Sequence, residues 1–280
     1  MIFDAPAIDW LTFTTWNDLE FLSWQEWQKN QPGDQKTGKI RMYEGNWIGS
    51  SFVGEGRQNN KPHGMIRVSG SESNNAYFEL LRGDYAKCTR LDIQITTPLP
   101  ADYSARIFAD DLRSGQNGEY ERTVTLVENS DGFDTVYLGS RKSDRLARFY
   151  VKEIEDQKFL RFEVEHKGVW SQVVSKAIQE DRATLAGALL DFLESIEVED
   201  SQGILKMFRD QLNSFQAGLS LPKVIRDKNK TMQWIMEQVT PSLIRLLNDH
   251  DFGQELYDHL ESLLESTVKS ASPQKFRPYE

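Results

Sequence analysis

The stretch CTRLDIQITTPLP, Cys88–Pro100, alternates apolar and polar residues more cleanly than any other part of the chain. In an extended segment successive side chains point to opposite faces, so Leu91, Ile93 and Ile95 share one face. The residues on the other face are Arg90, Asp92, Gln94 and Thr96. This pattern predicts a strand that packs one face on a core and leaves the other face for polar side chains.

The segments on either side extend this strand into a sheet. Extended segments separated by turn residues are predicted at 8–16, 39–56, 64–74, 122–140, 145–154 and 159–168. Helices are predicted at 16–30, 73–85 and 101–115, and a 3.6-residue apolar spacing dominates from Thr184 onward. The predicted fold class is therefore α+β, with an antiparallel sheet-based domain over residues 1–170 and a helical C-terminal region over residues 171–280.

The composition excludes several classes of protein. A net charge of -10 does not suit a protein that coats nucleic acid through a broad positive field, although local binding of DNA remains open. No apolar run approaches the ~18 residues of a membrane span, and no signal-peptide pattern follows Met1, so we expect a cytoplasmic protein with no membrane partner. Cys88 is the one cysteine, and we expect it to be a small core residue.

A basic segment around Tyr150 interrupts the acidic background. From residue 141 to residue 152 the only acidic residue is Asp144, and the basic residues are Arg141, Lys142, Arg145, Arg148 and Lys152. Such a segment is most often a solvated strand or helix face. The functional alternative is that these cations hold a phosphate group next to the tyrosine.

Three predicted strands place polar side chains opposite apolar ones. With Phe149 and Val151 inward on one strand, and Phe162 and Val164 inward on the next, a set of charged residues and one phenol faces outward. If the three strands are neighbours, these groups gather on one surface. They are Asp92, Gln94, Arg148, Tyr150, Lys152, Arg161, Glu163, Glu165 and Lys167.

This surface suits attack by a tyrosine on a phosphodiester. A phenol has a reference pKa near ~10, so it becomes a nucleophile at neutral pH only when cations such as Arg148 and Lys152, or a metal ion, favour the phenolate. Carboxylate and amide oxygens are hard ligands that suit Mg²⁺ or Mn²⁺ rather than zinc. The candidate ligands are Asp92, Glu163, Glu165 and Gln94.

The residues alone leave two other interpretations open. Outward carboxylates and lysines are ordinary on the solvated face of an antiparallel sheet, and a tyrosine there more often packs across strands than reacts. The segment around Tyr150 also fits a helix, because Ala147, Val151 and Ile154 lie on one helical stripe.

Several motifs resemble the replication initiation factor family of plasmids, phages and integrative elements, the Rep_trans group. The segment YLGSRKSDRLARFYVKEIE, residues 137–155, follows CTRLDIQIT and precedes FLRFEVEHKG, in the order of that family. WLTFT near the start and TMQWIMEQVTPSL near the end are also similar to family members. The residues that match the tyrosine motif are Tyr137, Gly139, Ser140, Arg141, Ser143, Arg148, Tyr150 and Lys152.

The resemblance implies a sequence-specific, metal-dependent DNA endonuclease that nicks and rejoins a strand to start rolling-circle replication. It implies that Tyr150 forms a covalent 5'-phosphotyrosine, with Arg148 and Lys152 beside it. The family's acidic metal site maps onto Asp92 and Glu163 or Glu165, with Gln94 as a weaker ligand. The His-hydrophobe-His motif of many other rolling-circle initiators is absent. The expected partners are DNA, as an origin hairpin or single strand, and by analogy a second copy of the chain and a host helicase.

Other segments are candidate DNA contacts. The turn at Ser140, Arg141, Lys142 and Ser143 either cradles a phosphate or only joins two strands, and Arg145 follows it. Arg57, Lys61 and Arg67 form a second candidate DNA contact. Arg57 and Lys61 lie in a predicted polar loop over residues 56–64, where His63 is expected to be idle. Trp16, Trp24 and Trp27 follow helical spacing and are expected in the core. A basic stretch at 221–230 adds Lys223, Lys228 and Lys230.

Two alternative functions remain open from the sequence. A relaxase of an integrative or mobilisable element performs the same cleavage at a transfer origin. A non-catalytic DNA-binding regulator would keep the scaffold without the chemistry, and its mark would be a missing tyrosine or acid.

Overall fold

A computed structural model of the chain describes residues 5–80, 86–116, 122–130 and 133–215. Contacts divide the chain into two units, Met1–Val224 and Ile225–Glu280, and all the described residues belong to the first. The helices predicted after residue 215, and with them Lys223, Lys228 and Lys230, lie outside the described residues.

The described unit is built on one large antiparallel sheet. Its ten strands follow the order β2-β3-β4-β5-β1-β6-β10-β9-β8-β7, and every neighbouring pair is antiparallel. The strands are β1 (Ala7–Thr15), β2 (Gln35–Ile40), β3 (Tyr43–Ile48), β4 (Ser51–Gln58), β5 (Lys61–Ser69), β6 (Ala86–Pro98), β7 (Val124–Val127), β8 (Thr135–Leu138), β9 (Arg145–Ile154) and β10 (Gln157–Lys167). The predicted α+β class with an antiparallel sheet is confirmed.

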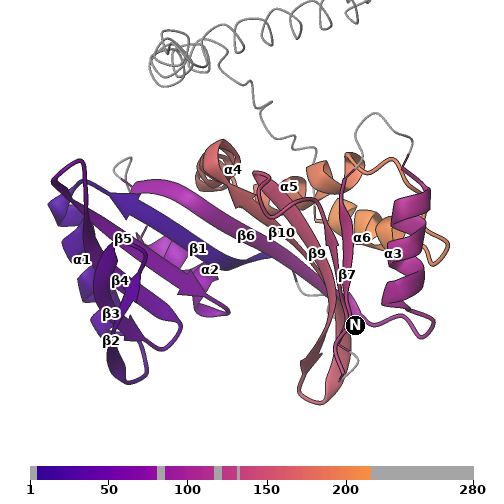
Figure 1. Cartoon of the computed structure of the whole chain (residues 1–280), viewed down its shortest axis with the longest axis horizontal. Coiled ribbons are helices and arrows are strands. Elements are labelled where there is room, and N and C mark those ends of the chain that lie inside the picture. The colour runs from indigo at the N-terminus through magenta and orange to yellow at the C-terminus, as the bar shows by residue number, and fades with distance from the viewer. Residues whose placement is uncertain (1–4, 81–85, 117–121, 131–132, 216–280) are drawn as a thin grey trace, which may run out of the picture. The chain divides into compact units, whose positions relative to one another are not determined.

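All six described helices pack on the same face of the sheet. They are α1 (Asp18–Lys29), α2 (Glu72–Leu80), α3 (Ala105–Ser114), α4 (Gly168–Glu180), α5 (Thr184–Glu194) and α6 (Ile204–Asn213). Aromatic contacts fix this arrangement, since Tyr77 of α2 meets Phe13, Phe108 of α3 meets Phe149, and Phe192 of α5 and Phe208 of α6 meet Phe162. In Figure 1, α1 and α2 lie behind the strands of the left half and α3 lies on the outer side of the right half. We call the face that no described helix covers the open face.

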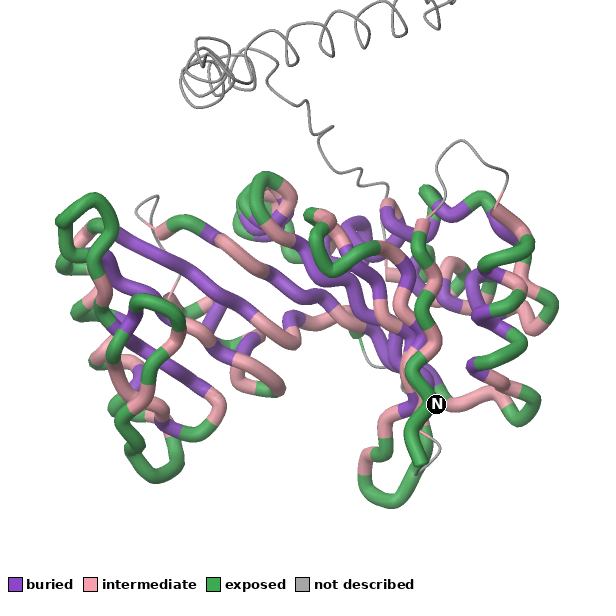
Figure 2. The backbone as a smooth tube through the Cα atoms, in the orientation of Figure 1, coloured by how far each residue is buried: buried purple, intermediate pink, exposed green. Residues whose placement is uncertain are grey.

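Alternation along the central strands produces this division. Leu91, Ile93 and Ile95 of β6 are completely buried in the core beneath the helices, as their spacing predicts. Phe149 of β9 stacks on Phe162 of β10 with ring centroids 4.7 Å apart, so the strands that follow share the same apolar layer. Figure 2 shows that burial is continuous along the middle strands and that exposure is concentrated in loops and hairpin ends.

The structure corrects one local prediction and confirms another. Residues 56–64 are not a polar loop: β4 and β5 run through them and join at Asn59 and Asn60, which both have positive φ and form a two-residue turn. The segment over 145–154 is a strand, so the helical alternative for Tyr150 is excluded.

A helix that the sequence pattern did not predict lies at the expected domain boundary. Trp170 falls inside α4, and α4, α5 and α6 pack on the sheet within the first unit. Ser171 of α4 donates a hydrogen bond to the Cys88 carbonyl of β6 at 3.1 Å. The described part of the helical region therefore shares the core of the sheet.

Cys88, Trp24 and Trp16 were all expected in the core, and the structure places the first two there but not the third. Cys88 is buried, as expected of a small core residue. Trp24 is fully buried, but Trp16 is 51% exposed, because it precedes the N-cap Asn17 and lies outside the helix whose apolar side reaches the core. Among the described helices, none is long and apolar enough to cross a membrane.

Candidate active site

The three strands that carry the predicted site are neighbours in the sheet, in the order β6-β10-β9. Their registers place Glu165 opposite Asp92, Glu163 opposite both Gln94 and Arg148, and Arg161 opposite Tyr150. Directly opposed residues point to the same face of a sheet. The predicted acids, the phenol and Arg148 therefore meet on the open face.

Two arginines and three acids form a network there, which we call the acid–arginine cluster: Arg90, Asp92, Arg148, Glu163 and Glu165. Arg90 holds Asp92 with two hydrogen bonds, Nε to Oδ1 at 2.9 Å and Nη2 to Oδ2 at 2.6 Å, and its Nη2 lies 2.9 Å from Glu165 Oε2. Arg148 Nη2 lies 2.9 Å from Asp92 Oδ2 and also donates to Glu163 Oε1. Each arginine thus bridges two carboxylates.

Tyr150 joins this cluster through its hydroxyl. The half-buried phenol donates a hydrogen bond to Glu163 Oε2 at 3.1 Å. Burial raises the pKa of Tyr150 above its ordinary value, and the negative charge of Glu163 raises it further, while Arg161 lowers it. As the side chains stand, the phenol is held in its neutral form, and Arg161, which alternation assigned to the same surface, is a cation near it.

Lys152 and Gln94 lie on the same face at the margins of the cluster. Burial, followed by the charge of Arg161, lowers the pKa of Lys152, whereas Asp9 and Glu163 raise it. Gln94 accepts a hydrogen bond from Thr96 through Oε1 at 2.9 Å. Both residues are half-buried, so neither is fixed as tightly as Asp92.

The acids of the cluster are buried, and burial favours their protonated forms. Asp92 is 0% exposed and Glu163 is 1% exposed. Burial raises the pKa of Asp92, against the lowering effect of Arg90. Burial also raises the pKa of Glu163 to about 7, and the Asp92 carboxylate adds to that rise while Arg148 opposes it. Charged groups this deep need either a proton or a cation beside them.

The cluster can be tested for its fit to a divalent metal ion. The guanidinium group of Arg148 lies between one oxygen of Asp92 and one of Glu163, so two hard oxygens already converge on a positive charge. Glu165 is further occupied, because Lys167 Nζ lies 3.0 Å from its Oε1. In the part of the chain that the structure describes, no group of three His, Cys, Asp or Glu side chains is arranged to hold a metal. The oxygens of Asp92 and Glu163 that converge there are the ones that Arg148 already binds.

The predicted phosphate turn lies between β8 and β9. Gly139 has a φ of 112°, a conformation that favours glycine, and the Ser143 hydroxyl donates to the Ser140 carbonyl at 2.6 Å. Arg141 lies over the Tyr137 ring at 5.3 Å, and Lys167 donates to the Arg141 carbonyl at 2.7 Å. This last contact ties the turn to Glu165, while Ser140, Arg141 and Lys142 stay exposed.

Arg145 does not lie with the other predicted phosphate contacts, and we correct that prediction. Its side chain is on the helix-covered face, 2.8 Å from Asp191 of α5 and over the Trp170 and Phe192 rings at 4.3 and 5.0 Å. Arg145 is the first residue of β9, where alternation assigns odd positions to the core side. Its charged group therefore binds residues of α4 and α5 between the helices and the sheet.

Arg57 and Lys61 are exposed at the end of the β4–β5 hairpin, apart from the acid–arginine cluster in the strand order. His63 follows them in β5 and is not an idle loop residue. It is buried and its Nδ1 lies 2.7 Å from the Tyr43 hydroxyl.

The sequence pattern did not show the parts of the site whose roles depend on side-chain pairing. Arg90 and Thr96 were assigned to the correct face, but alternation does not show that Arg90 chelates Asp92 or that Arg161 Nε donates to Thr96 at 3.1 Å. Asp9 was not singled out, and its Oδ1 lies 3.4 Å from Arg161. One sequence signal could have indicated these pairs. Each of the three strands carries an arginine on its polar face, and the neighbouring strand carries an acid on the same face.

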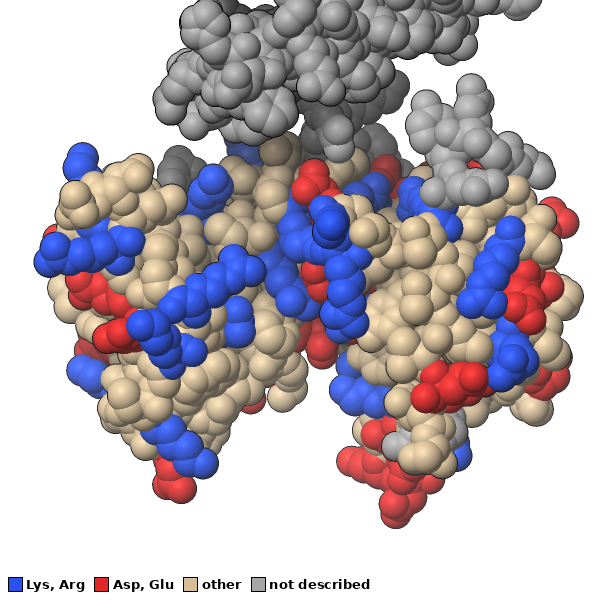
Figure 3. Space-filling model, viewed as in Figure 1, with Lys and Arg blue, Asp and Glu red and all other residues tan. Residues whose placement is uncertain are grey.

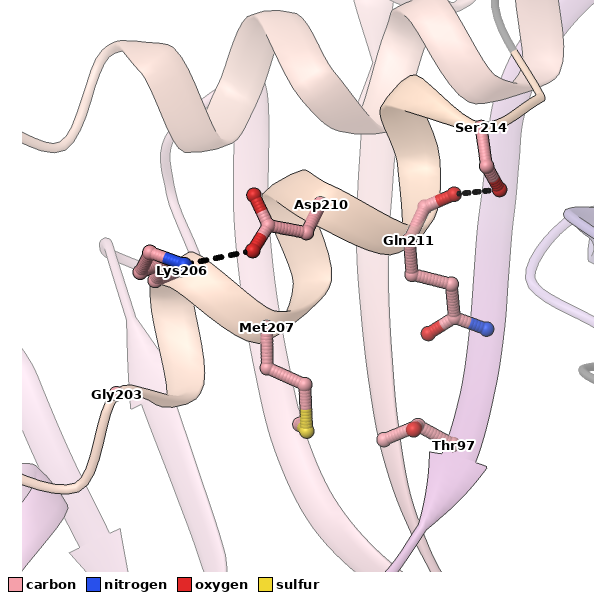
Figure 4. A pocket seen from close by; sticks show the side chains of 7 residues that line it. All are labelled: Thr97, Gly203, Lys206, Met207, Asp210, Gln211 and Ser214. Carbon is pink, nitrogen blue, oxygen red and sulfur yellow. Dashed lines mark hydrogen bonds and ion pairs between the residues drawn. The ribbon is translucent and has the colours of Figure 1, made fainter.

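A pocket on the helix-covered face carries none of these groups. It has a volume of about 510 Å³ and lies between α6 and the end of β6 (Figure 4). Its two charged side chains, Lys206 and Asp210, pair with each other at 2.9 Å. This pocket is therefore separate from the acid–arginine cluster.

No family model and no curated protein matches this chain. The interpretation of the site depends on its geometry and on the motifs in the sequence.

Proposed function

We propose that the chain is a replication initiation protein that nicks and rejoins one DNA strand through Tyr150. The observation that carries the proposal is the hydrogen bond from the Tyr150 hydroxyl to Glu163, inside a cluster of buried acids bridged by arginines. A packing tyrosine needs no such partner, since a phenol on a solvated face can bond to water. Here the hydroxyl is directed at a buried carboxylate within hydrogen-bond distance, which is placed to accept its proton.

In the proposed reaction the Tyr150 oxygen attacks the phosphorus of a DNA phosphodiester. Glu163 accepts the phenolic proton, the bond between phosphorus and the 3'-oxygen breaks, and the 3'-oxygen takes a proton from water and leaves as a hydroxyl. The 5'-phosphate remains joined to Tyr150. Attack by a 3'-hydroxyl on this phosphotyrosine reverses the step and rejoins the strand.

The surrounding residues position the strand and balance its charge. Arg148 precedes the phenol by two residues on β9 and Arg161 lies opposite it on β10, so both would bind the oxygens of the reacting phosphate. A Mg²⁺ or Mn²⁺ ion bound by Asp92 and Glu163, with Gln94 and Glu165 nearby, would supply positive charge for the phosphate oxygens. Arg90 orients the Asp92 carboxyl with two hydrogen bonds and opposes the effect of burial, which raises its pKa.

The same site would serve a relaxase of an integrative or mobilisable element, which cuts at a transfer origin with identical chemistry. A non-catalytic regulator is less well supported, because the tyrosine and the acids are all present and in contact.

The test is covalent capture of DNA by the full chain. A labelled single-stranded oligonucleotide that contains the origin of the source element is incubated with Mn²⁺ and run on a denaturing gel. We expect a protein–DNA adduct that Tyr150→Phe abolishes, with a loss of more than about 10³-fold, since the nucleophile is removed while the ring is kept. EDTA should also abolish it.

Tyr137→Phe is the matched control, because Tyr137 lies directly opposite Arg148 on the same face and belongs to the neighbouring strand β8. It should form the adduct normally. An adduct that survives in Tyr150→Phe and disappears in Tyr137→Phe would move the nucleophile to Tyr137. No adduct with the unaltered chain would favour the non-catalytic regulator.

A further inference from the structure

The half of the open face formed by β1, β4 and β5 carries aromatic rings and cations that the proposed cleavage does not use. Trp16 is 51% exposed and its ring lies over the His63 ring at 4.2 Å between centroids. His63 is fixed from behind by the Tyr43 hydroxyl at 2.7 Å. The exposed indole thus lies against one buried ring, His63, which is itself fixed by Tyr43, and this contact restrains it compared with a mobile surface side chain.

Three cations in this half have no acidic partner. Within the described ranges, Arg41, Arg67 and Lys87 make no ion pair. The Nε atom of Arg67 is buried and has no hydrogen-bond partner in the described part of the chain. Burial lowers the pKa of Arg67, and the nearby charges of Arg90 and Arg41 lower it further. Like charges held this close are stabilised by an anion.

The sheet register places Arg67 and Lys87 on the open face, and Arg41, in the turn between β2 and β3, is close enough for its charge to lower the pKa of Arg67. Arg67 is opposite Thr12, and Thr12 is opposite Arg90; Lys87 is opposite Thr14, which is opposite Met65. Two acids lie on the neighbouring strands, Glu44 on β3 and Glu55 on β4, directly opposite each other. Glu55 is in turn opposite Gly64 of β5, and a Cβ atom added to Gly64 would meet the Phe21 ring of α1. Those acids therefore point to the helix-covered side. In Figure 3, Lys and Arg side chains gather over the middle of the face shown and continue over its left half.

Trp10 and Arg90 connect this half to the acid–arginine cluster. Arg67 and Arg90 lie over the Trp10 ring at 5.0 and 4.4 Å, and Trp10 is directly opposite Asp92. Arg90 thus contacts Trp10 on one side and the acids Asp92 and Glu165 on the other. A chain of phosphates and bases that reaches Tyr150 can continue across β6 and β1 onto β5 without leaving the open face.

We propose that Trp16 on His63, with Arg41, Arg67 and Lys87, forms a subsite for unpaired nucleotides of a single DNA strand. Trp16 stacks on a base, and the three cations bind the phosphates beside it. Unpaired bases are required because a base stacked inside a duplex cannot present its face to an indole. The inference deepens the proposed function, since a nicking enzyme must hold the strand beyond its nucleophile, but its binding test does not depend on cleavage.

The test measures binding of a fluorescein-labelled oligodeoxythymidylate by anisotropy, with the full chain in EDTA so that no cutting occurs. Trp16→Ala should raise the Kd by about 5- to 100-fold, the range typical of one base stacked on an aromatic ring. Trp16→Phe should recover most of the affinity because it keeps a ring. Leu19→Ala is the matched control, since Leu19 is 78% exposed on α1, and it should change nothing.

Salt dependence tests the cations separately. Lys87→Ala should reduce the slope of log Kd against log salt by about 0.7, the value for one phosphate contact to a single strand. Lys39→Ala is the control, because Lys39 is paired with Glu44 at 2.8 Å, and its slope should stay unchanged.

The outcomes separate this inference from the proposed function. If Trp16→Ala, folded by circular dichroism, binds as tightly as the unaltered chain, the subsite is wrong even when Tyr150 forms its adduct. If binding weakens but no adduct ever forms, the subsite holds and the nicking proposal fails. Duplex DNA of the same length that loses as much affinity with Trp16→Ala would overturn the requirement for unpaired bases.

Discussion

Glu163 is the residue on which the chemistry of the open face converges. It accepts a hydrogen bond from Tyr150, contacts Arg148 and lies near Asp92, all while 1% exposed. Its raised pKa means that the folded chain holds a proton there at pH values where an unfolded chain has released it. The protonation of this one carboxyl therefore links stability to the chemistry.

This linkage predicts how stability changes with pH in the absence of metal. The folded state binds more protons than the unfolded state between the ordinary glutamate pKa, about 4.3, and the folded value of about 7. The contribution of Glu163 to the free energy of unfolding is therefore present below pH 4.3 and is lost as the pH rises towards 7. Urea unfolding in EDTA at pH 5, 6, 7 and 8 measures it.

Glu163→Gln is the control for this prediction. Glutamine resembles the protonated acid at every pH, so the variant should lose less stability than the unaltered chain between pH 5 and pH 7. Added Mn²⁺ should restore stability at pH 8 in the unaltered chain and less in the variant. Parallel pH curves for the two chains would show that Glu163 is not the group responsible.

At the scale of elements, the β9–β10 hairpin carries a turn that its sequence does not favour. Ile154 pairs with Gln157, and the two residues between them, Glu155 and Asp156, have φ of 50° and 60°. Two-residue turns with both φ positive favour Asn-Gly, because a larger side chain clashes with its own backbone there. Glu155 is the least suited residue in this hairpin.

Replacing Glu155 and Asp156 together by Asn and Gly should stabilise the chain by about 1 kcal/mol. The β4–β5 turn is an internal control, since Asn59 and Asn60 already have φ of 52° and 60° and asparagine tolerates them. Asn60→Gly should therefore gain less. Urea midpoints compare the two, and an equal gain at both turns would remove turn chemistry as the explanation.

Sequence patterns predicted the strands well and the helix layer less well. The strict alternation of β6, β9 and β10 is enough to assign Asp92, Tyr150 and Glu163 to polar faces, because a strand has only two faces. Alternation does not give the order of strands in the sheet. The sequence therefore predicted that these three side chains lie close together only if β6, β10 and β9 are neighbours. Arg145 was misassigned because a charge count ignores facing, and α4 was missed because its buried Ser171 and Ser175 weaken the apolar stripe.

For the whole described unit, the helices support the strands that carry the site. Phe208 of α6 is fully buried and lies 5.5 Å from the Phe162 ring, which stacks on Phe149 directly behind Tyr150 and Glu163. Helices and sheet therefore form one core, and we expect them to unfold together.

Phe208→Ala tests this cooperativity. It should cost about 3 to 5 kcal/mol, as for other buried aromatic truncations, and should lower a single transition seen both by helix and by sheet signals in circular dichroism. Lys206→Ala, on the exposed side of α6, should change little. Separate transitions, with only the helical one shifted, would mean that α6 belongs to an independently folding part.

The strand order has a consequence for how copies of this chain meet. Among the described strands, β2 and β7 stand at the two margins of the sheet, the positions where a strand of another molecule could pair. β7 has only four residues, and β2 presents Lys36, Gly38 and Lys39 within six residues, features that discourage such pairing. We therefore do not expect two molecules to pair edge to edge into one continuous sheet. A dimer would have to form through another surface.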